Sequence, residues 1–324
     1  MSRQKILVVV DPTASEQPAV TQGLALCRFL DCDLELLICH YDSQFAGRDF
    51  LVATEREALR EQSLRHQLGY LNSLRETLAA SDIKVTTRAV WDKPLADAIV
   101  RVALREEPRL VLKDTHHHSS IARTLFTITD WQLIRALPTP LWLVKNPPLQ
   151  DAVVLAAVDP SHEHDKPASL DKAVLQQARE MVGGAQERLH VYHGYDALAD
   201  IAKAGAFSLA PTPVPVAEIN ARVKTEHEQA FAILMAGQDL PPAQAHVLPG
   251  TAAEVLPALA RELHAGLLVM GAIARGPWDR VAVGSTAERV LDQLPCDVLI
   301  VKPPGFVSPV TYKAQSADFI EMSQ

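Results

Sequence analysis

The chain has 324 residues, a formal net charge of −8 at pH 7 and a pI near 5.8, so its length suggests about two domains. Its acidic balance argues against direct nucleic-acid binding, which normally requires a basic face, and against binding to anionic membranes. Because no segment approaches the roughly 18 to 20 consecutive apolar residues of a membrane span and no signal-peptide pattern opens the sequence, we expect a cytoplasmic protein.

In the first half of the chain, short β-branched runs alternate with longer amphipathic stretches. This alternation is typical of βαβ units on a parallel sheet. A long charged stretch over residues 54–79 predicts a helix between the second and third strands, and Asn146-Pro147-Pro148 predicts a linker. The five strands predicted in this half are residues 6–10, 34–40, 85–90, 110–113 and 141–144.

The second half repeats this order of elements. A long helix is predicted over residues 217–236, and a proline cluster over residues 211–215 marks a loop that the first half lacks. The tail beyond Gly305 is polar and has no periodic pattern, so we assign it no element. The five predicted strands are residues 153–158, 188–193, 245–248, 267–270 and 298–301.

Matched segments at both ends show that the halves are copies. Residues 5–12 return as residues 153–160, each ending in Val-Asp-Pro, and residues 137–145 return as residues 294–302, each opening with Leu-Pro. Two units of similar length bounded in this way indicate a tandem duplication. The predicted domains are therefore residues 1–148 and 149–306, followed by a tail at 307–324.

The segment with the most chemical features begins at the end of the fourth strand of the second half. It runs from Met270-Gly271 to Gly284-Ser285-Thr286, where a helix is predicted to begin. Glycine at a strand exit lets the backbone approach a ligand, and N–H groups and hydroxyls at a helix N-terminus favour an anion. The alternative is that Gly284 turns the chain and Ser285 caps the helix.

Several of these features together resemble the universal stress protein family. They are a first strand ending in Val158-Asp159, a glycine followed thirteen residues later by Gly-Ser, and the final strand Leu-Pro-Cys-Asp-Val-Leu-Ile-Val. The resemblance covers residues 5–302, and the layout is similar to that of tandem-domain members. It implies an α/β fold with two tandem flavodoxin-like (adenine nucleotide alpha hydrolase-like) domains. Each would be a five-stranded parallel sheet of order 3-2-1-4-5 with helices on both faces.

The resemblance also implies a nucleotide site in the second domain. ATP-binding members carry the loop G-x2-G-x9-G-[ST], which this chain matches except for Ala274 at the second glycine. Asp159 would lie near the ribose and a phosphate-bound Mg²⁺, or would instead cap its own turn. Gly250 would approach the nucleotide or would instead be an ordinary turn glycine. Arg275 would contact a phosphate or would instead be a solvated surface arginine. The implied nucleotide-binding residues are Val158, Asp159, Gly250, Met270, Gly271, Ala274, Arg275, Gly284, Ser285 and Thr286.

The first half lacks the three glycines of this loop. Aligning Lys145 with Lys302 places Asp114 on Gly271, and it also places His117 on Ala274 and Thr127 on Gly284. An aspartate at the strand exit would repel phosphate. We therefore expect that the first domain does not bind ATP in the manner of the family.

A histidine-rich segment occupies the place of the missing glycines and raises the question of a metal. Three imidazoles and a carboxylate could bind Zn²⁺, which takes four ligands. Consecutive histidines cannot all point at one ion, so another residue would have to complete the site. We favour a solvated polar loop and expect no stoichiometric zinc. The metal-ligand candidates are Asp114, His116, His117, His118 and His40.

The functional hypotheses follow from these motifs. Because no nucleophile–base pair, metalloprotease motif or P-loop is found, we expect at most a weak ATPase. The leading hypothesis is a stress-response protein that binds ATP or a related nucleotide, with or without Mg²⁺, in its second domain, the first serving as scaffold or another ligand site. The alternative is a binding protein for an apolar or sugar-nucleotide ligand near residues 206–216. We expect the two domains to pair through their final strands as an intramolecular pseudo-dimer. The sequence is compatible with further homo-oligomers.

Overall fold

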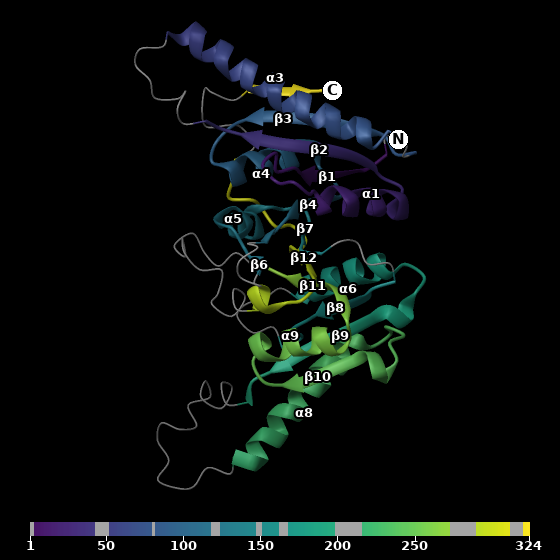
Figure 1. Ribbon diagram of the computed structural model, residues 1–324. Coiled ribbons are helices and arrows are strands. Elements are labelled where there is room, and N and C mark those ends of the chain that lie inside the picture. The colour runs from purple at the N-terminus through teal and green to yellow at the C-terminus, as the bar shows by residue number, and fades with distance from the viewer. Residues whose placement is uncertain are drawn as a thin grey trace. The chain divides into compact units, whose positions relative to one another are not determined.

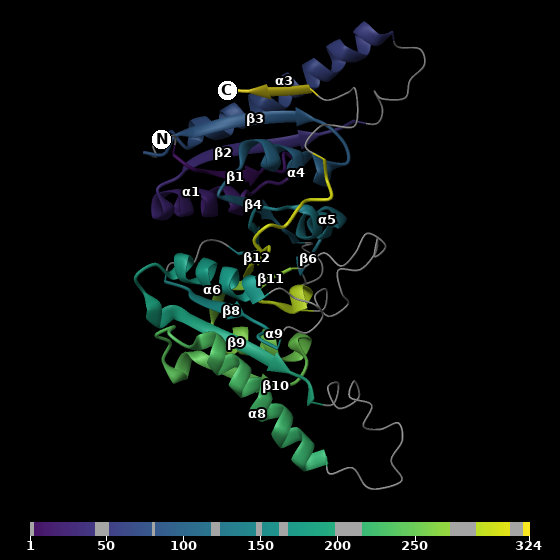
Figure 2. The ribbon, with the colours of Figure 1, turned by 180° about the vertical axis from the view of Figure 1, so that it is seen from behind.

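The computed structural model describes residues 3–42, 52–79, 82–117, 124–146, 151–161, 168–197, 216–272, 290–311 and 320–324. The chain divides into two compact units (Figures 1 and 2). Unit 1 comprises Met1–Leu149 together with Gly305–Gln324, and unit 2 comprises Gln150–Pro304. Within the described ranges, no helix is both long and apolar enough to cross a bilayer.

Unit 1 is a parallel sheet covered by helices on both faces. Its strands lie in the order β3-β2-β1-β4-β7, which confirms the predicted order 3-2-1-4-5. Right-handed crossovers place α1 and α3 on one face and α4 and α5 on the other, where α4 packs against α5. The elements are β1 Lys5–Val9, α1 Pro18–Leu30, β2 Asp33–His40, α3 Ala53–Thr77, β3 Val85–Trp91, α4 Leu95–Glu106, β4 Leu110–Asp114, β5 His116–His117, β6 Thr124–Leu125, α5 Ile128–Ala136, β7 Leu141–Val144 and β13 Ile320–Ser323.

Unit 2 repeats this arrangement. Its parallel strands lie in the order β10-β9-β8-β11-β12, which again confirms 3-2-1-4-5. Helix α6 packs on β8, β11 and β12, and α8 packs on β9 and β10. The elements are β8 Val153–Ala157, α6 Ala168–Val182, η2 Gln186–Arg188, β9 Leu189–Tyr195, α8 Val216–Met235, η3 Pro242–Gln244, β10 Ala245–Pro249, α9 Ala252–Glu262, β11 Ala265–Gly271 and β12 Asp297–Val301.

The cores explain why the strands are recognisable in the sequence. Ile6, Leu7 and Val8 of β1 are all fully buried, and Leu155 and Ala156 are the equivalents in β8. Strands covered on both faces read as continuous apolar runs rather than alternating ones. The central strands of each unit could therefore be predicted, and they hold the strand ends in fixed positions.

The C-terminal tail, for which the sequence predicts no element, adds a sixth strand, β13, to the main sheet of unit 1 as described. Strand β13 pairs antiparallel with β3, so that Glu321 lies opposite Val90 and Met322 opposite Ala89. Ile320 and Met322 pack against a buried cluster that includes the fully buried Trp91. The tail is therefore part of the first unit although it follows the second in sequence.

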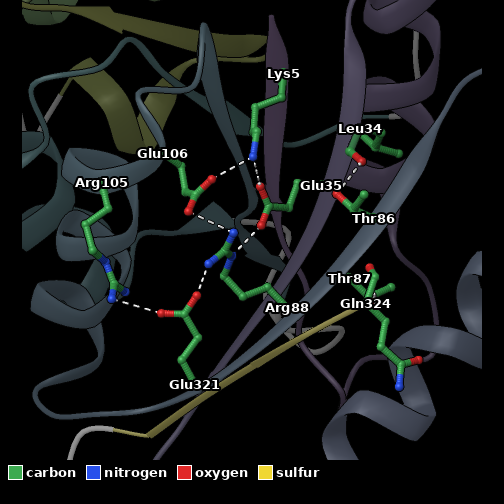
Figure 3. Close-up of polar contacts among 10 residues, drawn as sticks. All are labelled: Lys5, Leu34, Glu35, Thr86, Thr87, Arg88, Arg105, Glu106, Glu321 and Gln324. Carbon is green, nitrogen blue, oxygen red and sulfur yellow. Dashed lines mark hydrogen bonds and ion pairs between the residues drawn. The ribbon is translucent and has the colours of Figure 1, made fainter. Parts of the chain in front are cut away.

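Ion pairs hold the other face of β13 (Figure 3). Glu321 pairs with Arg88 of β3 and with Arg105 of α4, the latter with 2.9 Å between Nη1 and Oε2. Arg88 also contacts Glu106 at 2.8 Å and the buried Glu35. Burial alone would raise the pKa of Glu106, but the hydrogen bond from Lys5 and the charge of Arg88 hold this pKa below its usual value.

Candidate functional site

The sequence-predicted residues of unit 2 that the structure describes lie at one edge of its sheet. Val158 directly follows β8, Met270 and Gly271 end β11, and Gly250 directly follows β10. These strands are parallel, so their carboxyl ends meet at the same edge. Strands β8 and β11 are neighbours at the point where the strand order reverses, which is where open α/β sheets bind ligands.

Asp159 is engaged within its own turn. Its backbone N–H donates to Asp171 Oδ1 at 3.0 Å, and its Oδ1 accepts a hydrogen bond from the Ser161 hydroxyl at 2.6 Å. Asp11 of unit 1 does the same with Thr13, whose N–H and hydroxyl both donate to Oδ1. The strand-tip aspartate therefore stabilises a turn in both units, as the turn-capping alternative predicts.

The local structure explains why Gly250 and Gly271 are glycines. Gly250 has φ +121°, which side chains rarely adopt, and its N–H donates to Tyr195 O at 2.8 Å. A Cβ on Gly271 would lie 2.6 Å from Leu170 Cδ2, so this glycine lets α6 approach the strand exit. Gly271 is thus required for the packing of α6, and the N–H of Gly250 is used by the turn.

A lysine that the sequence analysis did not select lies beside this strand exit. Lys302, directly after β12, is 7% exposed, and its Nζ donates to Ala272 O at 3.2 Å. Ala272 in turn donates its N–H to Val301 O. An ammonium so close to Gly271 favours an anion at this edge. The sequence did contain a signal for this lysine, because both repeats end in lysine, at Lys145 and Lys302.

The remaining predicted residues lie outside the described residues. They are Ala274, Arg275, Gly284, Ser285 and Thr286.

In unit 1 the equivalent strand exit is occupied by a side chain. Asp114, at the end of β4, accepts a hydrogen bond on Oδ1 from the Ala19 N–H at 2.7 Å, in the first turn of α1. A helix N-terminus attracts negative charge. The carboxylate of Asp114 therefore interacts favourably with the N-terminus of α1.

Thr127, the residue of unit 1 that aligns with Gly284, also bonds to neighbouring residues of its own unit. Thr127 caps α5: its Oγ1 accepts from Asp130 N at 3.2 Å, and its own N–H donates to Asp130 Oδ2 at 2.7 Å. Such a reciprocal capping box satisfies the first-turn donors. Lys113 Nζ lies 2.8 Å from Asp130 Oδ1, and the Asp130 side chain is fully buried. The positions of unit 1 that align with Gly271 and Gly284 thus make contacts within the unit.

A buried histidine pair lies behind the strand tips of unit 2. His193 of β9 is 1% exposed; its Nδ1 is 3.3 Å from Val158 O and its Nε2 is 2.8 Å from His227 Nδ1 on α8. Tyr195 stacks on His227 with 5.1 Å between ring centroids. Sequence analysis missed this pair, although a histidine at an inward position of an apolar strand was a usable signal.

We expect acid to weaken unit 2 before unit 1. Burial lowers the pKa of His193 and also the pKa values of His190 and His246, whereas in unit 1 burial lowers that of His40. In the unfolded chain a histidine has a pKa near 6.5, above its lowered value in the folded protein. As the pH falls below about 6.5, the unfolded state therefore binds more protons than the folded state, and the free energy of unfolding decreases. For the buried His193 the slope can reach about 1.4 kcal/mol per pH unit.

Hydrogen exchange read segment by segment at about pH 7 and about pH 5.5 measures this difference. Protection of β8 and β9 should fall more than that of β1 and β2, and His193→Gln should reduce the gap. Equal losses in the two units would contradict the assignment.

Among the candidate metal ligands, the structure describes the side chains of Asp114 and His40. In the described part of the chain, no three His, Cys, Asp or Glu side chains are placed to hold a metal ion. His40 is half-buried and packs edge-on against Trp91. The side chains of His116 and His117, and all of His118, lie outside the described residues.

Comparison with known proteins identifies the family. The model of the universal stress protein family matches residues 2–145 and 153–302. The chain belongs to the universal stress protein family. It is 26% identical over 328 residues to universal stress protein E of Escherichia coli K12, covering 97% of this chain and 99% of that protein. The universal stress protein E homolog of Haemophilus influenzae is 24% identical over 314 residues, covering 94% and 98%.

Solved structures confirm the fold. A protein of unknown function from Pseudomonas aeruginosa PAO1 superposes with a TM-score of 0.69 at 24% identity, covering 93% of each chain. A universal stress protein of Archaeoglobus fulgidus superposes with a TM-score of 0.61 at 16% identity, covering 92% of this chain and 98% of its own. The resemblance inferred from the sequence, including the tandem arrangement of two family domains, is thereby confirmed.

Proposed function

We propose that this member of the family is a stress-response protein that binds an ATP-like nucleotide in unit 2, while unit 1 serves as a scaffold or binds a different ligand. The contrast between the two strand exits carries this proposal. In unit 2 the exit is a glycine beside the ammonium of Lys302. In unit 1 it is the carboxylate of Asp114, already bound to the N-terminus of α1.

The residues of unit 2 suit a phosphate chain in position and in charge. Gly271 ends β11 at the switch point, and Lys302 contributes positive charge. Gly284, Ser285 and Thr286 would donate N–H groups to phosphate oxygens, as in the family loop. If Mg²⁺ accompanies the nucleotide, it would neutralise phosphate charge, and the Asp159 carboxylate, which now bonds Ser161, would supply one of its oxygen ligands.

The proposed activity is binding, without a dedicated hydrolytic apparatus. The described carboxylates near the strand tips already accept hydrogen bonds, Asp159 from the Ser161 hydroxyl and Asp171 from the Asp159 N–H. His193 is fully buried and bonded to His227, so it is not placed to activate water. Any ATPase activity should be weak.

Two observations favour the second candidate function, a binding protein for a different small molecule. Gly250 uses its N–H within the protein, and Ala274 stands where family members carry glycine. Mass spectrometry of the molecules released by denaturing purified protein separates the two functions. An adenine nucleotide supports the proposal, and an apolar or sugar-nucleotide ligand supports the alternative.

Replacing Gly284 by Val should weaken ATP binding by more than tenfold, a loss of about 1.4 kcal/mol or more. The β-branched side chain would stand where the backbone must meet phosphate. Isothermal titration calorimetry with ATP measures this change. The matched control is Thr127→Val in unit 1, which should leave ATP affinity unchanged. Equal losses at both positions would reject the assignment of the nucleotide to unit 2.

A further inference from the structure

Unit 1 contains a cavity on its α4–α5 face, separate from its own strand exits. Its volume is about 270 Å³. This is slightly below the roughly 300 Å³ at which pockets for drug-sized ligands begin, so it suits a smaller molecule than a nucleotide. The residues that line it are Asp97, Arg101, Gln132, Arg135, Ala136, Pro309, Val310 and Thr311.

The C-terminal segment forms one wall of this cavity. The Ser308 hydroxyl donates to Ala136 O at 2.7 Å, and Val310 N–H donates to Ser308 Oγ at 3.2 Å. Figure 2 shows this yellow segment lying beside α5 and α4. One hydrogen bond therefore attaches this wall to α5, and a second one, from Val310 to Ser308, braces the segment itself.

A buried arginine in the cavity wall lacks part of its hydrogen bonding. Arg101 is 3% exposed; its Nε lies 3.3 Å from Asp92 Oδ2, and its Nη2 donates to Lys93 O at 3.4 Å. Its Nη1 is buried and has no hydrogen-bond partner in the described part of the chain. Native proteins rarely leave buried donors unsatisfied, because each costs about 1–3 kcal/mol.

The charges of the wall favour an anion. Arg101 and Arg135 contribute two guanidinium groups, and Asp97 contributes one carboxylate. The nearby Asp92 is directed at Arg101 Nε and is fully buried at its side chain, so it does not line the cavity. Guanidinium forks match the planar, bidentate geometry of carboxylate and phosphate oxygens.

We propose that this cavity binds a small molecule through a carboxylate or phosphate group held between Arg101 and Arg135. Asp97, one helical turn before Arg101 on α4, lowers the affinity for multiply charged anions. The site is independent of the nucleotide proposed for unit 2. It gives the first unit a ligand of its own although its family loop is filled by Asp114 and Thr127.

Calorimetry on the full chain with acetate and with inorganic phosphate tests the proposal. The protein should carry Gly284→Val throughout, so that phosphate binding at the candidate site of unit 2 does not contribute. We expect saturable binding of at least one anion, and Arg135→Met should weaken it about tenfold or more. Binding of acetate alone assigns a carboxylate ligand and binding of phosphate alone a phosphate ligand; both results support the site.

Asp97→Asn supplies the decisive variant, because misfolding cannot imitate its expected effect. Removing the carboxylate should tighten anion binding by roughly 3- to 10-fold through lost repulsion. The matched control is Arg28→Met on α1, an exposed arginine that pairs with Asp82 and should leave binding unchanged. The proposal is overturned if neither anion binds saturably at high millimolar concentration, or if Arg135→Met and Asp97→Asn bind as the parent does.

Discussion

Replacing Lys113 by Met should lower the free energy of unfolding of unit 1 by about 3–5 kcal/mol. The Asp130 carboxylate, with a fully buried side chain, would lose the ammonium that lies 2.8 Å away. An uncompensated buried charge is among the most destabilising single changes. Urea unfolding followed by tryptophan fluorescence in a Trp278→Phe background measures the change, because the other three tryptophans, Trp91, Trp131 and Trp142, belong to unit 1.

The double change Lys113→Met with Asp130→Ala is the matched control. Aligning Lys145 with Lys302 shows that unit 2 carries Met270 and Ala287 at these two positions. The double variant should cost only about 1 kcal/mol, the usual value of a helix cap, since Asp130 also bonds Thr127. A cost equal to the sum of the two single changes would mean that the pair is not coupled, contrary to the argument.

The divergence of unit 1 from the family loop was only half visible in the sequence. The missing glycines at positions 114 and 127 were apparent from the alignment of the repeats. What fills their place was not, because Asp114 bonds Ala19, ninety-five positions earlier. Such a contact depends on the tertiary arrangement of β4 and α1, which no local pattern encodes.

The parallel strands, in contrast, could be predicted because their signal is local. A strand buried on both faces must be apolar along its length, as in Leu155 and Ala156 of β8. The boundaries moved slightly: β8 ends at Ala157, one residue before the prediction, and β11 extends to Gly271. Right-handed crossovers then leave few topologies for such a series of elements, which is why the order 3-2-1-4-5 was within reach.

Strand β13 could not be predicted for the opposite reason. Its four residues carry one weak alternation, and the partners that make it a strand lie far away in the chain. Glu321 needs Arg88 and Arg105, and Ile320 needs the cluster around Trp91. The His193–His227 pair is similar, since a strand and a helix that are 34 positions apart must meet before either ring has its partner.

Deleting residues 320–324 should lower the free energy of unfolding of unit 1 by about 3–5 kcal/mol. Half-burial of Ile320 and Met322 contributes roughly 1 kcal/mol each. Arg88, whose side chain is 12% exposed, would lose its pairing with Glu321, and β3 would lose its ladder with β13. At about 2–4 °C per kcal/mol, the melting temperature of unit 1 should fall by roughly 10 °C in a thermal scan.

The same deletion should change the association state of the protein. Without β13, the edge of β3 exposes unpaired groups, among them the Thr87 N–H and C=O that now bond Gln324. Open edges of this kind pair with other chains, so light scattering should show self-association of the truncated protein. Glu321→Gln separates the contributions, because it keeps the ladder and removes only the charge. It should cost less than half as much as the deletion and leave association unchanged. A truncated protein with the melting temperature and mass of the full chain would show that β13 neither stabilises unit 1 nor shields its edge.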